Sequence, residues 1–287
     1  MSAGLAGTQR VENSLTLNSA SADSLLLEAY HFYSALTQTA THLNSSGKAF
    51  DAEPNLGGNL LYAGELDVHG CATVIAGNVA GCATLAATAD SAAQKQAIRE
   101  GTVDFVVTSL DEALRILKNE VRKKATVAVC VGLAPSDIER EMLERGVLPD
   151  LVAKGAWDEN RGAAKFGVDA REVRCIQPDR SQAFPDRNGA FLDWRVAQAS
   201  IRWMSKLDAI ALECLGSDVR ARRWIRLSPR YCGRSAQGQR LLHCDQEEAA
   251  TILDRLEGAV RNGAIGTEIS GSLRTGGETK VFRFFPA

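Results

Sequence analysis

Residues 101–152 read GTVDFVVTSLDEALRILKNEVRKKATVAVCVGLAPSDIEREMLERGVLPDLV. Short apolar runs in this stretch alternate with helical stretches that carry apolar residues on one face and charges on the other. The runs are Val103–Val107, Thr126–Gly132 and Leu148–Val152, and the helical stretches are Leu110–Arg122 and Pro135–Arg145. Because this alternation is typical of parallel strands joined by helical crossovers, the sequence predicts an α/β fold with a mainly parallel sheet and flanking helices.

The flanking sequence extends this pattern in both directions. Upstream, we expect strands at Cys71–Ala76 and Thr84–Ala89, helices at Leu25–Thr37 and Ser91–Glu100, and irregular chain over 48–64. Downstream, we expect a long connection over 153–192, helices at Asp193–Leu207 and Gln246–Val260, strands at Ala209–Cys214 and Trp224–Leu227, and a C-terminal β-hairpin of Thr267–Leu273 and Thr279–Phe285 around Gly276-Gly277. Residues 1–24 are then a flexible arm, and residues 25–287 form a single α/β domain with 64–152 as its best-defined part and 193–287 as a second half.

Composition excludes several classes of protein. Hydrophobic residues make up 45% and charged residues 24%, which is ordinary for a packed globular chain. The 33 Lys and Arg nearly balance the 35 Asp and Glu, and this balance argues against a nucleic-acid partner. The chain has no apolar run of the roughly 18 residues that span a bilayer, and no secretory signal at its start. We therefore expect a cytoplasmic protein with a small-molecule ligand and no membrane partner.

One candidate ligand site follows the run Cys71–Ala76. A glycine turn, Gly77-Asn78-Val79-Ala80-Gly81, comes directly after it, and Asp90 follows the next predicted strand. Backbone amides of such a turn can approach a pyrophosphate, and an acid after the second strand can accept hydrogen bonds from a ribose. The alternative is a plain tight turn between neighbouring strands, because the full GxGxxG pattern is absent.

The stretch from Gly64 to Val152 resembles the NAD-binding, Rossmann-like domain of the urocanase (urocanate hydratase) family. The resemblance runs through VIAGNVAG (74–81), LAATADSAAQKQAIREG (85–101), TVDFVVTSLDEAL (102–114) and AVCVGLAPSDIEREMLERGVLPDLV (128–152). It implies NAD as the cofactor, used as an electrophile during water addition to urocanate. It further implies that Gly77, Asn78 and Gly81 face the pyrophosphate and Asp90 the adenosine ribose. The chain departs from the family at 153–161, where AKGAWDENR replaces TDQTSAHDP.

Two further groups of residues could carry chemistry. Arginines gather between residues 220 and 234, next to Trp224 and Tyr231, and their guanidinium groups suit a carboxylate or phosphate; Arg220, Arg226 and Arg230 are the candidates for substrate or anion binding. Cys232 is a candidate nucleophile, in a context faintly similar to the family's active-site cysteine, and with His243 and Cys244 it could also bind a metal. The seven cysteines include no CxxC pair, so we expect no disulfide framework, and the metal site is the weaker alternative to no metal at all.

These observations leave two hypotheses for the function. The first is a urocanase-like, NAD-binding hydratase or lyase that acts on a small unsaturated or imidazole-bearing acid. The second is a catalytically inactive urocanase-like module that binds a protein or an anion through the arginine-rich segment. The second hypothesis also allows a homodimer built on the C-terminal hairpin.

Overall fold

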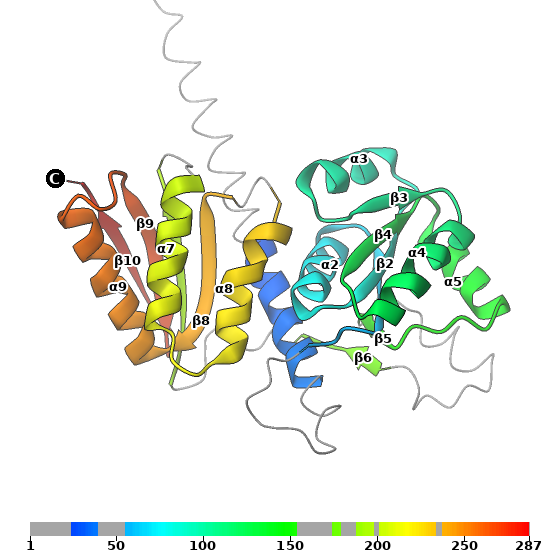
Figure 1. Cartoon of the computed structure of the whole chain (residues 1–287), viewed down its shortest axis with the longest axis horizontal. Coiled ribbons are helices and arrows are strands. Elements are labelled where there is room, and N and C mark those ends of the chain that lie inside the picture. The colour runs from blue at the N-terminus through cyan, green and yellow to red at the C-terminus, as the bar shows by residue number, and fades with distance from the viewer. Residues whose placement is uncertain are drawn as a thin grey trace, which may run out of the picture.

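The computed structural model describes residues 24–39, 55–153, 174–178, 188–197, 201–233 and 237–286. Two sheets organise these residues (Figure 1). The first has six parallel strands in the order β3-β4-β2-β1-β5-β6, and the second has four antiparallel strands in the order β10-β9-β7-β8. Within the described ranges, no helix combines the length and apolar character needed to cross a bilayer. The predicted arm before Ser24 and most of the predicted connection over 153–192 lie outside the described residues.

The parallel sheet confirms the predicted α/β fold. Its strands and helices are β1 (Leu60–Glu65), α2 (Val68–Ala80), β2 (Ala83–Ala87), α3 (Ser91–Glu100), β3 (Phe105–Val107), α4 (Leu110–Lys123), β4 (Val127–Val131), α5 (Pro135–Glu144), β5 (Leu151–Ala153) and β6 (Arg174–Ile176). Helices α4 and α5 pack on one face of this sheet, and α2 and α3 pack on the other. The central strands β2 and β4 are buried along their whole length, which explains their continuous apolar sequences.

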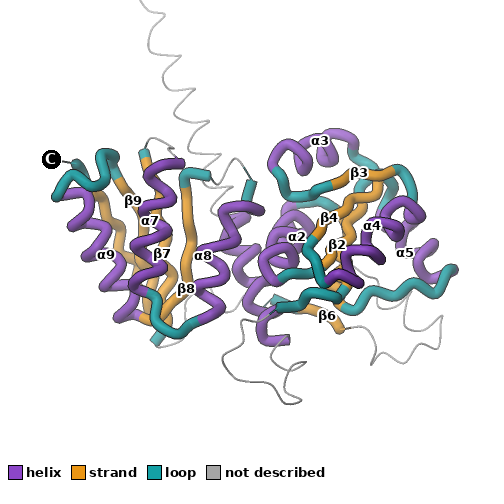
Figure 2. The backbone as a smooth tube through the Cα atoms, viewed as in Figure 1, coloured by secondary structure: helices purple, strands orange, loops and turns teal. Residues whose placement is uncertain are grey.

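The second half of the chain forms the antiparallel sheet and its helices. Its elements are β7 (Gly189–Val196), α7 (Ile201–Cys214), α8 (Val219–Tyr231), β8 (Gln239–Asp245), α9 (Gln246–Arg261), β9 (Ile269–Thr275) and β10 (Glu278–Phe284). Figure 2 shows α7, α8 and α9 on one side of these strands. The hairpin β9–β10 and helix α9 confirm two predictions, and Gly276 and Gly277 have the positive φ angles that a tight hairpin turn requires.

Several predicted elements are wrong in type. Cys71–Ala76 lies within helix α2, and the preceding strand is β1, in a stretch that the sequence suggested was irregular. Ala209–Cys214 and Trp224–Leu227 lie in helices α7 and α8 and are not strands. The predicted helix at Asp193–Leu207 is divided between the end of β7 and the start of α7.

Helix 24–39 lies between the two halves of the molecule (blue in Figure 1). Its apolar residues share one core with residues of α2, α8, β7 and β8. At the centre of this core, the Tyr30 ring packs edge-on against Trp224 and Phe191, with centroid distances of 5.2 and 5.5 Å. The core that supports α2 therefore includes residues from both halves of the chain.

Candidate functional site

The carboxyl ends of β1 and β5 mark the crevice where a ligand is expected in this fold. From β1 the chain continues to β2 on one side, and it later returns as β5 on the other side of β1. Such a reversal of strand order opens a crevice between the loops that follow the strands. The β1–α2 turn, Gly64–Gly70, is the described loop at this position.

Two glycines shape the β1–α2 turn. Gly64 has a φ of 77°, and the pairing of β1 with β2 shifts register between Tyr62 and Gly64. A Cβ atom at Gly70 would lie 1.8 Å from the carbonyl oxygen of Glu65, so only glycine fits there. The Leu66 amide donates to the carbonyl of Ala87 at 3.1 Å, which holds the turn beside the end of β2. The backbone thus retains the close approach typical of a Rossmann turn.

The carboxylate of Asp67 occupies the amino end of α2. Asp67 is the N-cap residue, and its Oδ1 accepts a hydrogen bond of 2.9 Å from the Gly70 amide. In a dinucleotide-binding turn, amides at this position point toward the pyrophosphate. Here the Gly70 amide is bound by the chain's own carboxylate, and the helix dipole already faces a negative charge.

Other carboxylates lie near the same end of α2. Burial is the main cause that raises the pKa of the Cys71 thiol to about 12, and the charges of Glu100 and Asp67 raise it further. Burial also raises the pKa of Cys130 to about 11, with a smaller contribution from Glu65. The carboxylates of Asp67, Glu100 and Glu65 disfavour a further negative charge nearby. This end of α2 is therefore a poor environment for a bound anion.

The predicted pyrophosphate residues lie at the opposite end of α2. Their structural premise, a strand followed by a turn, is wrong, because Gly77 and Asn78 belong to the last turns of the helix and Gly81 ends it with a φ of 97°. A Cβ atom at Gly77 would lie 2.7 Å from the Leu61 side chain, so this glycine allows α2 to pack closely on the sheet. The Nδ2 atom of buried Asn78 donates to the carbonyl of Thr102 at 3.2 Å. These residues lie at the carbonyl end of the helix dipole, which does not attract a phosphate.

Asp90 lies on the same edge of the sheet as the β1–α2 turn. It follows β2, is exposed, and caps α3 by accepting a hydrogen bond of 2.8 Å from the Ala92 amide. Its predicted contact with a ribose is untested. The sequence analysis missed Asp67, although Asp67 and Gly81 bracket a segment of helical length and could have indicated the helix.

The arginine-rich segment forms helix α8 and does not form one anion site. Two of its arginines stabilise helix ends: Arg223 donates from Nε to the Val79 carbonyl at 2.6 Å, and Arg222 donates from Nη1 to the Leu212 and Leu215 carbonyls at 2.8 Å each. Such contacts satisfy carbonyl groups that a helix leaves without partners at its carboxyl end. The predicted anion-binding residues Arg220, Arg226 and Arg230 are exposed, while Arg234 lies outside the described residues.

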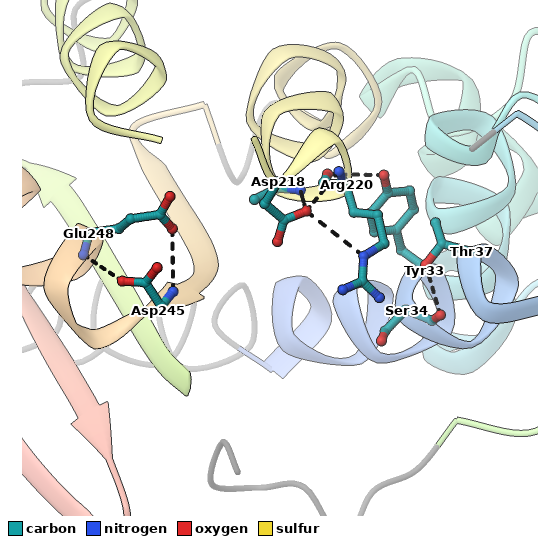
Figure 3. Close-up of polar contacts among 8 residues, drawn as sticks. Tyr33, Ser34, Thr37, Asp218, Arg220, Asp245 and Glu248 are labelled. Carbon is teal, nitrogen blue, oxygen red and sulfur yellow. Dashed lines mark hydrogen bonds and ion pairs between the residues drawn. The ribbon is translucent and has the colours of Figure 1, made fainter. Parts of the chain in front are cut away.

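Arg220 contacts Asp218 in its own segment and Tyr33 of helix 24–39 (Figure 3). Its Nε lies 3.8 Å from the Asp218 carboxylate, which also caps α8, and its carbonyl accepts a hydrogen bond of 3.1 Å from the Tyr33 hydroxyl. The Arg230 guanidinium lies over the ring of Tyr231, 5.3 Å from its centroid. Figure 3 also shows the capping box of Asp245 and Glu248 at the start of α9. The contacts of Arg220 and Arg230 thus lie within or next to α8.

Cys232 does not have the surroundings of a nucleophile. It is 4% exposed, and burial raises the pKa of its thiol to about 12. A protonated thiol is a weak nucleophile. His243 and Cys244 are adjacent in β8, so their side chains point to opposite faces of the sheet. Within the described residues, no group of three or more metal-ligating side chains occurs.

Parallel strands flanked by helices on both faces, with a glycine turn after the first strand, define a Rossmann-like protein. Comparison with known families agrees and is more specific. The family model for the urocanase Rossmann-like domain matches residues 37–185, slightly more than half of the 287 residues. The chain therefore belongs to the urocanase family, and its parallel half is a fold of the dinucleotide-binding type.

Proposed function

We propose that this chain is a non-catalytic binding module of the urocanase family, in which the diphosphate position of the Rossmann-like half is closed. The observation that supports this proposal is the hydrogen bond from the Gly70 amide to the Asp67 carboxylate at 2.9 Å. A diphosphate at this position would have to displace Asp67 and lie beside its negative charge.

The residues of the β1–α2 turn do not fit NAD. Bound NAD would supply an electrophilic ring for the family's hydration reaction, with its diphosphate on the amides at the start of α2. Two residues of this turn, Glu65 and Asp67, carry carboxylates, and both are exposed. Together they repel a diphosphate, so we derive no catalytic step through NAD.

A second candidate function is the NAD-dependent hydratase or lyase that family membership favours. Its substrate would be a small unsaturated or imidazole-bearing acid. This function would require Asp67 to release the Gly70 amide, and it would require a group other than the protonated thiol of Cys232 for any nucleophilic step. We favour the binding module because the first requirement acts against the geometry of the turn and the second against the burial of Cys232.

Binding of NAD to three forms of the full chain tests the proposal. The forms are the wild type, Asp67→Asn, which keeps a capping oxygen without the charge, and the double variant Glu65→Gly/Asp67→Gly, which removes both carboxylates. We expect no dinucleotide in native mass spectra of the purified wild type and no heat of binding at millimolar NAD. The double variant should gain measurable binding, provided that its thermal unfolding stays cooperative.

Two results would overturn the proposal. One is a wild-type protein that retains a dinucleotide through purification. The other is consumption of urocanate by the wild type in the presence of NAD, followed by its ultraviolet absorbance. A retained dinucleotide would show that the diphosphate position is open, and urocanate consumption would establish the second candidate function.

We also infer a reducing compartment, such as the cytoplasm, for this chain. None of its seven cysteines, all of which lie in the described residues, forms a disulfide, and four of them are buried. Reduced cysteines in such numbers are usual where disulfides do not persist. Labelling of the thiols in freshly lysed cells, before and after reduction, measures this directly.

A further inference from the structure

Among the described residues, α7 and α9 cover one face of the antiparallel sheet, and helix 24–39 covers only part of the other, which we call the open face. Trp194 and its alternate neighbours in β7 face the core under α7 and α9, so Asp193 and Arg195 face the opposite side. Helices α7 and α9 lie in front of the strands in Figure 1, and the open face is turned away from the viewer. A groove of about 750 Å³ lies on this face, within the size range of small-molecule sites.

Strand register arranges the groove as two rows across the sheet. In the first row, Gln239, Arg195, Ser270 and Arg283 follow one another across β8, β7, β9 and β10. In the second row, Leu241, Asp193, Ser272 and Val281 follow in the same strand order. Arg195 and Arg283 flank the small Ser270, so their Cα atoms lie two strand spacings apart, roughly 10 Å. The small Ser270 thus separates the two arginines within this row.

Arginines outnumber acids among the residues that line the groove. Arg195, Arg274 and Arg283 contribute three cations, and Asp193 contributes one anion. Asp193 is already engaged, because its carboxylate accepts hydrogen bonds from the Ser272 hydroxyl and amide and lies 3.9 Å from Nη2 of Arg274. Arg283 also pairs with Glu268 at 2.9 Å. The lining residues therefore favour a negatively charged ligand.

Arg274 lines this groove, and part of its guanidinium group has no partner within the described chain. Its Nε atom is buried and has no hydrogen-bond partner among the described residues. Its guanidinium lies 5.5 Å from the centre of the Phe191 ring, which orients the group. A buried donor without a partner is costly. Because solvent does not reach Nε, a ligand in the groove would contact the exposed part of the Arg274 side chain.

The first turn of helix 24–39 supplies an apolar side to the groove. Leu26 and Leu27 line it together with Leu241 and Val281. Ser24, the first described residue of helix 24–39, also lines the groove. A ligand that fits has an anionic group for the arginines and an apolar body for the leucines.

We propose that the groove on the open face of the antiparallel sheet binds a small organic carboxylate with an apolar body, held by Arg274 together with Arg195 and Arg283. The carboxylate accepts hydrogen bonds from these guanidinium groups, and the apolar body packs on Leu26, Leu27 and Leu241. None of the described residues that line this site belongs to the β1–α2 turn, so the site does not depend on whether that turn binds NAD.

Calorimetric titration of the full chain with four probes tests the proposal. The probes are hexanoate, adipate, hexanol and inorganic phosphate. We expect saturable binding of hexanoate or adipate, no binding of hexanol, and at most weak binding of phosphate. Arg274→Gln should weaken carboxylate binding by about tenfold or more, because a charge-assisted hydrogen bond is lost.

Two variants separate loss of the site from loss of the fold. Val281→Trp fills the groove from an exposed strand position and keeps all three arginines, and it should also weaken carboxylate binding. Arg261→Gln removes an exposed arginine on α9, on the other side of the sheet, and should leave binding unchanged. No saturable binding of either acid up to about 10 mM would overturn the proposal. So would acid binding that both Arg274→Gln and Val281→Trp leave intact, or phosphate binding as tight as that of the acids.

Discussion

The Nε atom of Arg223 in α8 donates a hydrogen bond of 2.6 Å to the carbonyl oxygen of Val79 in α2. This contact joins the carboxyl end of the Rossmann-like helix to the second half of the chain. The next residue, Trp224, donates from its indole to the carbonyl of Leu241 in β8 at 2.7 Å. Arg223 and Trp224 of α8 thus connect helix α2, which packs on the parallel sheet, to strand β8 of the antiparallel sheet.

Arg223→Met should lower the free energy of unfolding by about 1.5–3 kcal/mol, because a buried charge-assisted hydrogen bond is lost and the Val79 carbonyl is left without this donor. Urea denaturation followed by circular dichroism measures the change. Arg230→Met is the matched control on the same helix, and its exposed position predicts a change within about 0.5 kcal/mol. Equal effects of the two substitutions would contradict the structural role of Arg223.

Gly70→Ala should destabilise the fold by about 3 kcal/mol or more, since the new methyl group would collide with the Glu65 carbonyl oxygen. Gly258→Ala provides the opposite case. Gly258 is exposed within α9, and nothing lies within 4 Å of a Cβ atom there. This second change should stabilise the protein by about 0.5–1 kcal/mol, because alanine is the better helix former. Thermal midpoints of both variants, compared with the wild type, decide whether the β1–α2 turn is packed as described.

Asp67→Ala should cost about 1 kcal/mol of stability, because the first turn of α2 loses its cap. Asp67→Asn keeps a side-chain oxygen for the Gly70 amide and should restore most of this loss. Chemical denaturation of the pair measures both effects. If Asp67→Ala were as stable as the wild type, the carboxylate would not be held on the amide in solution.

Stability should fall in alkaline solution, in part through Cys232. Burial raises the pKa of its thiol to about 12 in the folded protein, whereas a thiol in the unfolded chain titrates near its ordinary pKa of about 8.5. The unfolded chain therefore loses a proton that the folded protein retains. The stabilising contribution is complete below about pH 8.5 and is lost as the pH rises toward 12, at about 1.4 kcal/mol per pH unit for one thiol.

Urea denaturation at several pH values between about 9 and 11 measures this slope. Cys232→Ala should make the slope shallower than that of the wild type, whatever its effect on stability at neutral pH. Cys175→Ala is the control, because Cys175 is exposed. The interpretation would be wrong if both substitutions changed the slope equally.

The periodicity of apolar residues was sufficient to predict a helix or strand where one face of that element is exposed. Helix α4 has Leu110, Leu114 and Leu117 on its buried face and charged residues elsewhere, and the structure confirms the predicted helix. The hairpin β9–β10 was equally clear, because its turn glycines lie between strands of alternating character. The family resemblance, carried by residues 64–152, is also confirmed.

Periodicity failed where an element is buried on several sides. Ten of the thirteen residues of α2 are buried, between the sheet, helix 24–39 and α8, so its sequence has no polar face. A short run of small apolar residues then looks like a strand. Helix α8 was missed for a related reason, since its arginines Arg222 and Arg223 contact helix ends instead of water.

Because part of α2 was predicted as a strand, the candidate pyrophosphate site was placed too late in the sequence. With Cys71–Ala76 taken as a strand, the next glycines became the ligand turn, although the turn after the first strand is Gly64–Gly70. Local sequence could not reveal the groove on the antiparallel sheet at all. Arg274 and Arg283 lie on the predicted hairpin, but Arg195 lies on β7, far earlier in the sequence, and only strand register places it beside them.

The core around Tyr30 bears on whether the two halves of the chain can fold separately. Its side chains come from helix 24–39, α2, α8 and two antiparallel strands. A gene fragment that ended after β6 would leave Ile75 and Leu61 without Trp224, and the remaining fragment would expose Trp224 and Phe191 to water. We therefore expect each piece to lose stability when it is separated from the other.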